Sequence, residues 1–263
     1  MQFPKSERII FDTETLSQVI CQLRFPQVLA IGTRPPDVFQ EIIRTEYPIY
    51  RKQNAVGAVG APPELSQFLE QLPMMPGPEA TTHWFDTLDG DRAISLGTNF
   101  VAVTAKRYPR WEGMRAEVER AVSALEEAYA PAFYERVGLR YQDLINRDEV
   151  GLEDRGWADL LNPSMVSLLG AGLNIDSAAD QIVTSALLHL DEPEGALVHL
   201  RHGVGGSSEH TYELDADFYI DNQTIERGPA LDQLDRLNHE EGNLFRWAIR
   251  DELRDALGVR EHE

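Results

Sequence analysis

The chain has 263 residues, of which 42% are hydrophobic and 26% are charged, as is usual for folded water-soluble proteins. Its 44 acidic against 24 basic residues give a formal net charge of -20, which disfavours binding to nucleic acid and to anionic membranes. Because Cys21 is the only cysteine, the chain cannot form an intramolecular disulfide. The sequence contains no apolar run of membrane-spanning length and no signal-like stretch at its N-terminus, so we expect a cytoplasmic protein.

The first elements in chain order are a strand and a helix. Residues 17–25 alternate apolar and polar side chains, which predicts a strand with one buried face. A helix is expected between Pro36 and Pro48, because apolar residues recur there at helical spacing and proline ends the pattern. Residues 48–80 are rich in Gly, Pro and Ala and predict a long irregular connection, with room for a short helix at 64–72.

Three antiparallel strands and a long helix follow. The strands are expected within residues 81–105, joined by tight turns at "DGD" and "GTN". A helix then begins at Pro109 and ends at Pro131, and its apolar stripe comprises Trp111, Met114, Val118, Ala121, Val122, Leu125 and Tyr129. Strand alternation resumes within residues 133–146, "FYERVGLRYQDLIN".

The last third repeats this pattern. After a short helix at about 157–169, strands are expected at 181–191, 195–203 and 211–221. One long helix at about 229–257 then closes the chain.

Three strands and a helix therefore occur twice, at 81–129 and at 181–257. We expect an α+β fold of antiparallel sheets with two long helices, consistent with a duplicated βββα unit. An N-terminal half at 1–150 and a C-terminal half at 151–263 are expected, either as separate units or as one continuous domain.

Four stretches, "VICQLRF" at 19–25, "YPRWEGM" at 108–114, "ERVGLRYQDLIN" at 135–146 and the ending "LNHEEGNLFRWAIRDELRDALG" at 237–258, carry a family resemblance. Through them the chain resembles, over nearly its whole length, a sporadically distributed family of bacterial proteins of unknown function. The resemblance implies a shared fold and supplies no catalytic residue. The patchy distribution of that family is typical of accessory functions, including defence against phage.

The segment "HTYELDADFYID" at 210–221 sets Glu213, Asp215, Asp217 and Asp221 on one face of a strand. A divalent cation needs six or more oxygen ligands from several directions, which one strand does not supply. We therefore expect a solvated or ion-paired strand face, with Arg201 or His199 of the preceding strand as partners. A metal or acid–base site and a protein-contact surface are the alternatives.

No motif in the sequence predicts a catalytic residue, a metal site or a cofactor. Cys21 lies on the apolar side of its strand, where a buried and unreactive thiol is expected. The pairs of histidines lack the spacing of metal ligands on a helix, and neither a G-x-S-x-G elbow nor a phosphate loop occurs. We therefore expect no metal and no cofactor, and lean away from an enzyme.

One ligand-site hypothesis remains. Aromatic side chains on the sheet and on both long helices either fill the core or line an apolar pocket between the two layers. Within such a pocket, the speculative ligand-binding residues are Arg140, His83, Asp86, Trp84 and Trp111. Arg140 would point away from the apolar face of its strand and pair with a carboxylate or a bound anion.

Three functions are compatible with these observations. The first expectation is a non-enzymatic protein whose acidic surface recognises a basic protein partner. The second is a small-ligand binder or enzyme that uses a cavity between the sheet and the long helices. The third is an inhibitor that imitates nucleic acid by its charge. The acidity also fits a source organism with an acidic proteome, and composition does not separate these causes.

Overall fold

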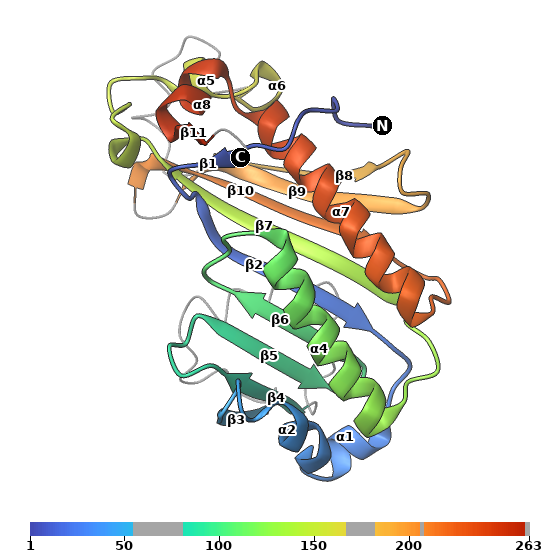
Figure 1. The fold of residues 1–263 in the computed structure, drawn as a ribbon. Coiled ribbons are helices and arrows are strands. Elements are labelled where there is room, and N and C mark those ends of the chain that lie inside the picture. Colours follow the sequence, from blue (N-terminus) through green and yellow to red (C-terminus); the bar gives the residue numbers. More distant parts are fainter. Residues whose placement is uncertain (55–80, 167–181, 206–207, 261–263) are drawn as a thin grey trace.

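The computed structural model describes residues 1–54, 81–166, 182–205 and 208–260. In these residues a nine-stranded antiparallel sheet has the order β3-β4-β5-β6-β2-β7-β10-β9-β8, and two long helices, α4 and α7, cover one of its faces (Figure 1). The α+β class with antiparallel strands is therefore confirmed. No helix of the described ranges is both long and apolar enough to cross a membrane.

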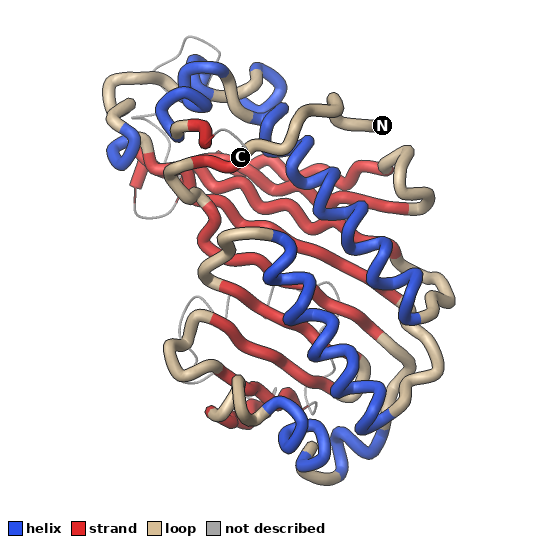
Figure 2. Tube along the Cα trace, in the orientation of Figure 1, coloured by secondary structure: helices blue, strands red, loops and turns tan. Residues whose placement is uncertain are grey.

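The strands of the large sheet are β2 Leu16–Arg24, β3 Ile49–Asn54, β4 Thr81–Asp86, β5 Arg92–Gly97, β6 Phe100–Ala105, β7 Arg136–Asn146, β8 Ile182–His189, β9 Ala196–Gly205 and β10 Ser208–Ile220. A separate pair joins β1 Ile10–Phe11 to β11 Val259–Arg260. The helices are α1 Leu29–Thr33, α2 Asp37–Ile43, α4 Trp111–Tyr129, α5 Trp157–Leu160, α6 Pro163–Val166, α7 Arg227–Ala248 and α8 Asp251–Leu257, with a 3-10 turn at Asp148–Val150. Figure 2 shows the strands as one layer and the two long helices as the other.

The sheet has the same strand order on both sides of its centre. There β2 pairs with β7, and Cys21 lies opposite Leu139. Outward from β2 come β6, β5 and β4, and outward from β7 come β10, β9 and β8. In each half the strand triplet leads into the long helix that covers it, which is the repeated three-strand and helix order of the sequence. One continuous sheet thus runs through both halves, and the second set of strands in it begins with β7.

The core lies between the sheet and the two long helices. The apolar stripe expected on α4 is buried from Trp111 to Leu125, while Tyr129 is partly exposed. On α7 the buried residues include Leu231, Leu234 and Leu244. Full burial of such side chains stabilises a fold by about 1.5–3 kcal/mol each, so these stripes hold both helices on the sheet.

Three elements differ from the expectations. Residues 49–54 form the edge strand β3 inside a region expected to be irregular, and the helix expected at 64–72 lies outside the described residues. The helix expected at 157–169 is two short helices as far as residue 166, since Leu161 is extended and Pro163 starts a new turn.

The single closing helix is also divided, into α7 and α8, at Ile249. Ile249 is extended and forms a β-bridge with Leu161, while the amide of Arg250 donates to the carbonyl of Leu160 at 2.8 Å. These tertiary hydrogen bonds replace the helical ones, so apolar periodicity alone did not reveal the break.

Candidate functional site

A cleft of about 890 Å³ lies beside α7. Its walls come from the segment Arg8–Leu16 that leads into β2, the turn before α4, Asp143 of β7 and one face of α7. Edge-to-face packing of Phe11 on Phe245, with ring centroids 5.7 Å apart, holds the N-terminal segment against α7. The cleft therefore joins residues from both ends and the middle of the chain.

Two of the acidic residues that line this cleft are Asp143, which is buried, and Glu241, which is partly buried. Asp143 occupies a helix-facing position of β7, opposite Leu214, and only 3% of the residue is exposed. Its Oδ1 accepts a hydrogen bond from the Thr15 hydroxyl at 2.6 Å. Glu241 extends from α7 into the same cleft. An element of the sheet and an element of the helical layer thus each contribute one acid.

Burial controls the ionisation of this pair. Desolvation raises the pKa of Asp143 to about 7, against the hydrogen bond from Thr15, which lowers it. Desolvation likewise raises the pKa of Glu241 to about 8, and repulsion from Asp143 adds to that rise while Arg246 opposes it. In the described part of the chain no lysine or arginine forms an ion pair with Asp143. Asp143 is therefore an acid without a cation paired to it in the described ranges, whereas the charge of Arg246 acts on Glu241.

Two of the basic residues that line the cleft, Arg8 and Arg260, have acidic partners. Arg8 forms two hydrogen bonds with Glu112, at 2.6 and 3.0 Å, and this pair lowers the pKa of Glu112 to about 2. Arg260 pairs with Asp12 next to the β1–β11 ribbon. Neither of these two arginines pairs with Asp143 or Glu241.

Aromatic side chains, among them Tyr108 and Trp111, also line the cleft. The hydroxyl of Tyr108 donates to Oδ1 of Asn238 at 3.1 Å, and the buried Tyr141 behind it donates to the same oxygen at 2.8 Å. The indole of Trp111 donates to Asp235 at 2.7 Å, so the ring is held in one orientation. An acidic pair beside fixed aromatic rings is an arrangement that attracts a cationic nitrogen.

Of the five ligand-site residues expected from the sequence, Trp111 lines this cleft and the other four do not. His83 is buried on β4, where its ring nitrogens contact the Tyr50 hydroxyl at 2.9 Å and the Ile31 carbonyl at 3.2 Å. Asp86 pairs with Arg51, whose guanidinium lies 5.8 Å from the centroid of a Trp84 ring. Three strands separate β4 from β7, so these residues do not meet Arg140.

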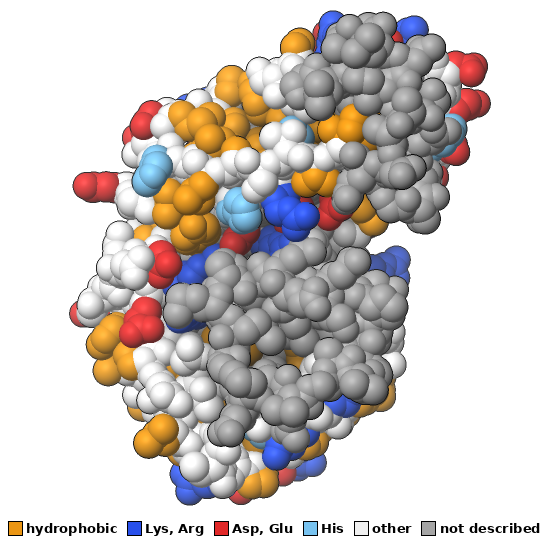
Figure 3. Space-filling view, turned by 180° about the vertical axis from the view of Figure 1, so that it is seen from behind, with side chains coloured by type: hydrophobic (Ala, Val, Ile, Leu, Met, Phe, Trp, Pro, Cys, Tyr) orange, Lys and Arg blue, Asp and Glu red, His pale blue; other side chains and the backbone are white. Residues whose placement is uncertain are grey.

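Arg140 lies on the sheet face away from the helices and pairs with a carboxylate. Its Nε and Nη2 donate to the two carboxylate oxygens of Asp215 at 2.7 and 2.6 Å. Next to it, Arg136 donates to Asp217 at 2.8 Å, and its guanidinium lies 4.5 Å from the Tyr219 ring. Figure 3 shows basic, acidic and histidine side chains gathered near the middle of this face.

The acidic strand is thus ion-paired, as expected. Arg201 and His199 lie opposite Asp215 and Asp217 in the register, as expected, but the close ion pairs of these two carboxylates are with Arg140 and Arg136. Asp215 is 3% exposed, so of the two expected states of this face, solvated or ion-paired, its carboxylate has the second. Strand β10 lies between β9 and β7, and both of these ion pairs are made with arginines of β7.

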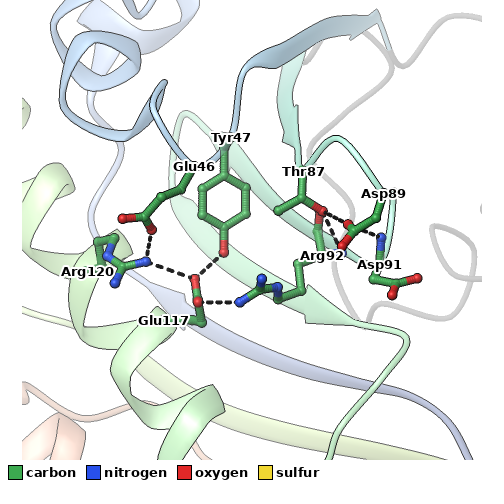
Figure 4. Close-up of polar contacts among 8 residues, drawn as sticks. All are labelled: Glu46, Tyr47, Thr87, Asp89, Asp91, Arg92, Glu117 and Arg120. Atoms are coloured by element: carbon green, nitrogen blue, oxygen red, sulfur yellow. Dashed lines mark hydrogen bonds and ion pairs between the residues drawn. The ribbon is translucent and has the colours of Figure 1, made fainter.

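A second polar cluster centres on Glu117 of α4 (Figure 4). Its carboxylate accepts hydrogen bonds from the Tyr47 hydroxyl and from Arg92, the latter at 2.5 Å. Arg120 lies between Glu117 and Glu46 and pairs with both. Each cation has an acidic partner here, so the cluster ties α4 to β5 and to the turn after α2.

No group of three or more His, Cys, Asp or Glu side chains in the described ranges has the arrangement of a metal site. Cys21 is completely buried, and burial raises the pKa of its thiol, in line with the expected unreactive cysteine.

The sequence reasoning missed Asp143 and Glu241. A signal for Asp143 was present, because this carboxylate interrupts the apolar series Val137, Leu139, Tyr141 and Ile145 at a position that the alternation assigns to the core. Glu241 gave no such signal within the polar "NHEEGN" segment. No family model matches the chain and no curated protein matches it, so its function is inferred from the geometry of the cleft.

Proposed function

We propose that the protein binds a small molecule with a protonated amine or guanidinium group in the cleft beside α7. One observation supports this above all: Asp143 and Glu241 place two carboxyl groups in one large cavity, and Asp143 has no cationic partner in the described residues. This is the cavity-based function among those expected from the sequence, with acids as its recognition groups. We take the protein to be cytoplasmic, as the sequence predicts.

The electrostatics favour a cation. An ammonium group about 4 Å from a carboxylate gains about 4 kcal/mol at an effective dielectric constant near 20, before desolvation costs. Binding would also return the two carboxyl groups to their ionised form, because a nearby positive charge lowers a raised carboxyl pKa. The protein alone therefore holds protons that a cationic ligand displaces.

The size and lining of the cleft indicate the rest of the ligand. Small-molecule sites commonly occupy about 300–1,000 Å³, a range that includes the 890 Å³ found here. Phe11, Phe245 and Trp111 offer apolar surface next to the acids. A ligand with a cationic nitrogen on an aliphatic or aromatic body would satisfy both parts of the wall.

The experiment is calorimetric titration with agmatine, 1,4-diaminobutane and tryptamine, with indole-3-ethanol as a neutral control. Asp143→Asn and Glu241→Gln should each weaken amine binding about tenfold or more, equivalent to about 1.4 kcal/mol. Asp232→Asn, an exposed acid on the same helix, should leave it unchanged. Affinity should rise between pH 6 and pH 8, with proton release on binding. Amines that fail to bind at millimolar concentration, or bind Asp143→Asn as tightly as the native protein, contradict the proposal.

A basic protein partner remains the second candidate, and the net charge of -20 favours it. Recognition by the general acidity would weaken steeply with salt and would not depend on Asp143 or Glu241. A cationic peptide that binds equally well to the native protein and to Asp143→Asn, and is released at 0.5 M salt, would support this candidate instead.

A further inference from the structure

The strand β8 forms one edge of the sheet and carries no charged residue. Its sequence from Ile182 to His189, "IVTSALLH", contains no Asp, Glu, Lys or Arg, in a chain in which 26% of residues are charged. One side of β8 pairs with β9, and no described strand pairs with its other side. The amino group of Met1 donates to the carbonyl of His189 at 2.7 Å, so the edge that is open to a partner strand is the uncharged stretch 182–188.

The opposite edge of the same sheet is protected. Strand β3 is shorter, follows Pro48, and includes Arg51 and Lys52. Charges, prolines and short lengths are the means by which proteins prevent pairing at sheet edges. The contrast between β3 and β8 indicates that β8 is an edge suited to pairing.

The side chains of β8 are also apolar where they are exposed. Val183 and Leu187 are 46% and 56% exposed, and both lie on the face away from the long helices, as does Ser185 between them. Side chains such as those of valine and leucine gain stabilising cross-strand contacts when their strand has a paired neighbour, which an open edge does not provide. The strand thus carries an apolar residue on each side of a central serine.

We propose that β8 pairs with β8 of a second copy of this chain, antiparallel, about a two-fold axis at Ser185. In this register Val183 of one copy lies opposite Leu187 of the other, and Ile182 lies opposite Leu188. Thr184 lies opposite Ala186. No charged pair is opposed anywhere along the seam, and all seven residues from 182 to 188 have a partner, so the strand is complementary to itself.

The net charge of the chain opposes this association at long range. Each copy carries -20, but the screening length is about 8 Å at physiological ionic strength, and the seam itself is neutral. The dimer should therefore become tighter as salt concentration rises. A seam held by ion pairs would show the reverse dependence.

Cysteine substitution tests the register directly. Cys21 is the only cysteine of the chain and is completely buried, so an introduced thiol has no competitor. Across the axis, two Cα atoms of residue 185 would lie about 4.5–5.5 Å apart, within disulfide range. Two residues at position 184 would be diagonal neighbours about 7–8 Å apart, outside that range. Both positions are exposed, which makes Thr184→Cys a matched control for Ser185→Cys.

Under mild oxidation most molecules of Ser185→Cys should form a disulfide-linked dimer. The yield of this dimer should be at least tenfold lower for Thr184→Cys. Sedimentation of the native protein should show a dimer that tightens from 0.05 to 0.5 M salt, and Ser185→Lys should shift it to monomer. A native protein that stays monomeric at about 100 μM, or equal cross-linking of both cysteine variants, overturns the proposal.

Discussion

Arg140 of β7 and Asp215 of β10 form a bidentate pair on the sheet face away from the helices, with hydrogen bonds of 2.7 and 2.6 Å. Their side chains are 8% and 5% exposed. At this burial, removal of one partner leaves a charge that neither water nor protein compensates. Removal of only one partner should therefore lower the free energy of unfolding strongly, whereas replacement of both by apolar residues should lower it less.

We expect Arg140→Met to lower the free energy of unfolding by about 3–5 kcal/mol, because Asp215 would keep a buried charge. The double variant Arg140→Met with Asp215→Leu should lose less than the sum of the single changes. Arg8→Met, at an exposed ion pair, should cost at most about 1 kcal/mol. Urea denaturation measures all four proteins, and a loss below about 1 kcal/mol for Arg140→Met would contradict the expectation.

The acids of the cleft should make stability depend on pH. The folded-state pKa values of Asp143 and Glu241, about 7 and about 8, lie above their unfolded values. Both acids therefore bind protons more tightly in the folded state than in the unfolded chain. Their contribution to the free energy of unfolding is complete below about pH 4 and is lost as the pH rises through 7 and 8. Between pH 5 and pH 8.5 the loss assigned to Asp143 should be about 1–3 kcal/mol.

Asp143→Asn should flatten this decline, because the amide does not ionise. Denaturant unfolding at half-unit pH steps measures the slope, and Asp232→Asn should retain the native slope. An Asp143→Asn slope equal to that of the native protein would show that Asp143 ionises as freely in the folded state as in the unfolded chain.

Cys21 should report unfolding. Its side chain faces the helices from the central strand β2, and burial raises the pKa of its thiol. A thiol reagent should therefore label the native protein only during opening of the core, at least about 100-fold more slowly than the urea-unfolded chain. Rapid stoichiometric labelling under native conditions would mean that this part of the sheet is open to solvent.

The local pattern of the sequence determined most elements. The strands β4 to β6, the stripe on α4 and the alternation of β7 were predicted, because periods of two and of 3.6 residues directly reflect which face is buried. The same regularity predicted the repeated three-strand and helix order and the buried position of Cys21.

Tertiary structure decided the features that depend on residues far apart in the chain. Ile249 leaves the helical pattern because Leu161 offers it a β-bridge, and Asp215 pairs with Arg140 because β10 lies beside β7. Asp143 and Glu241 share a cleft only because α7 packs over β7. Periodicity reports the face that a side chain occupies but not its partner, since strand order and helix packing are set by the burial of the whole core.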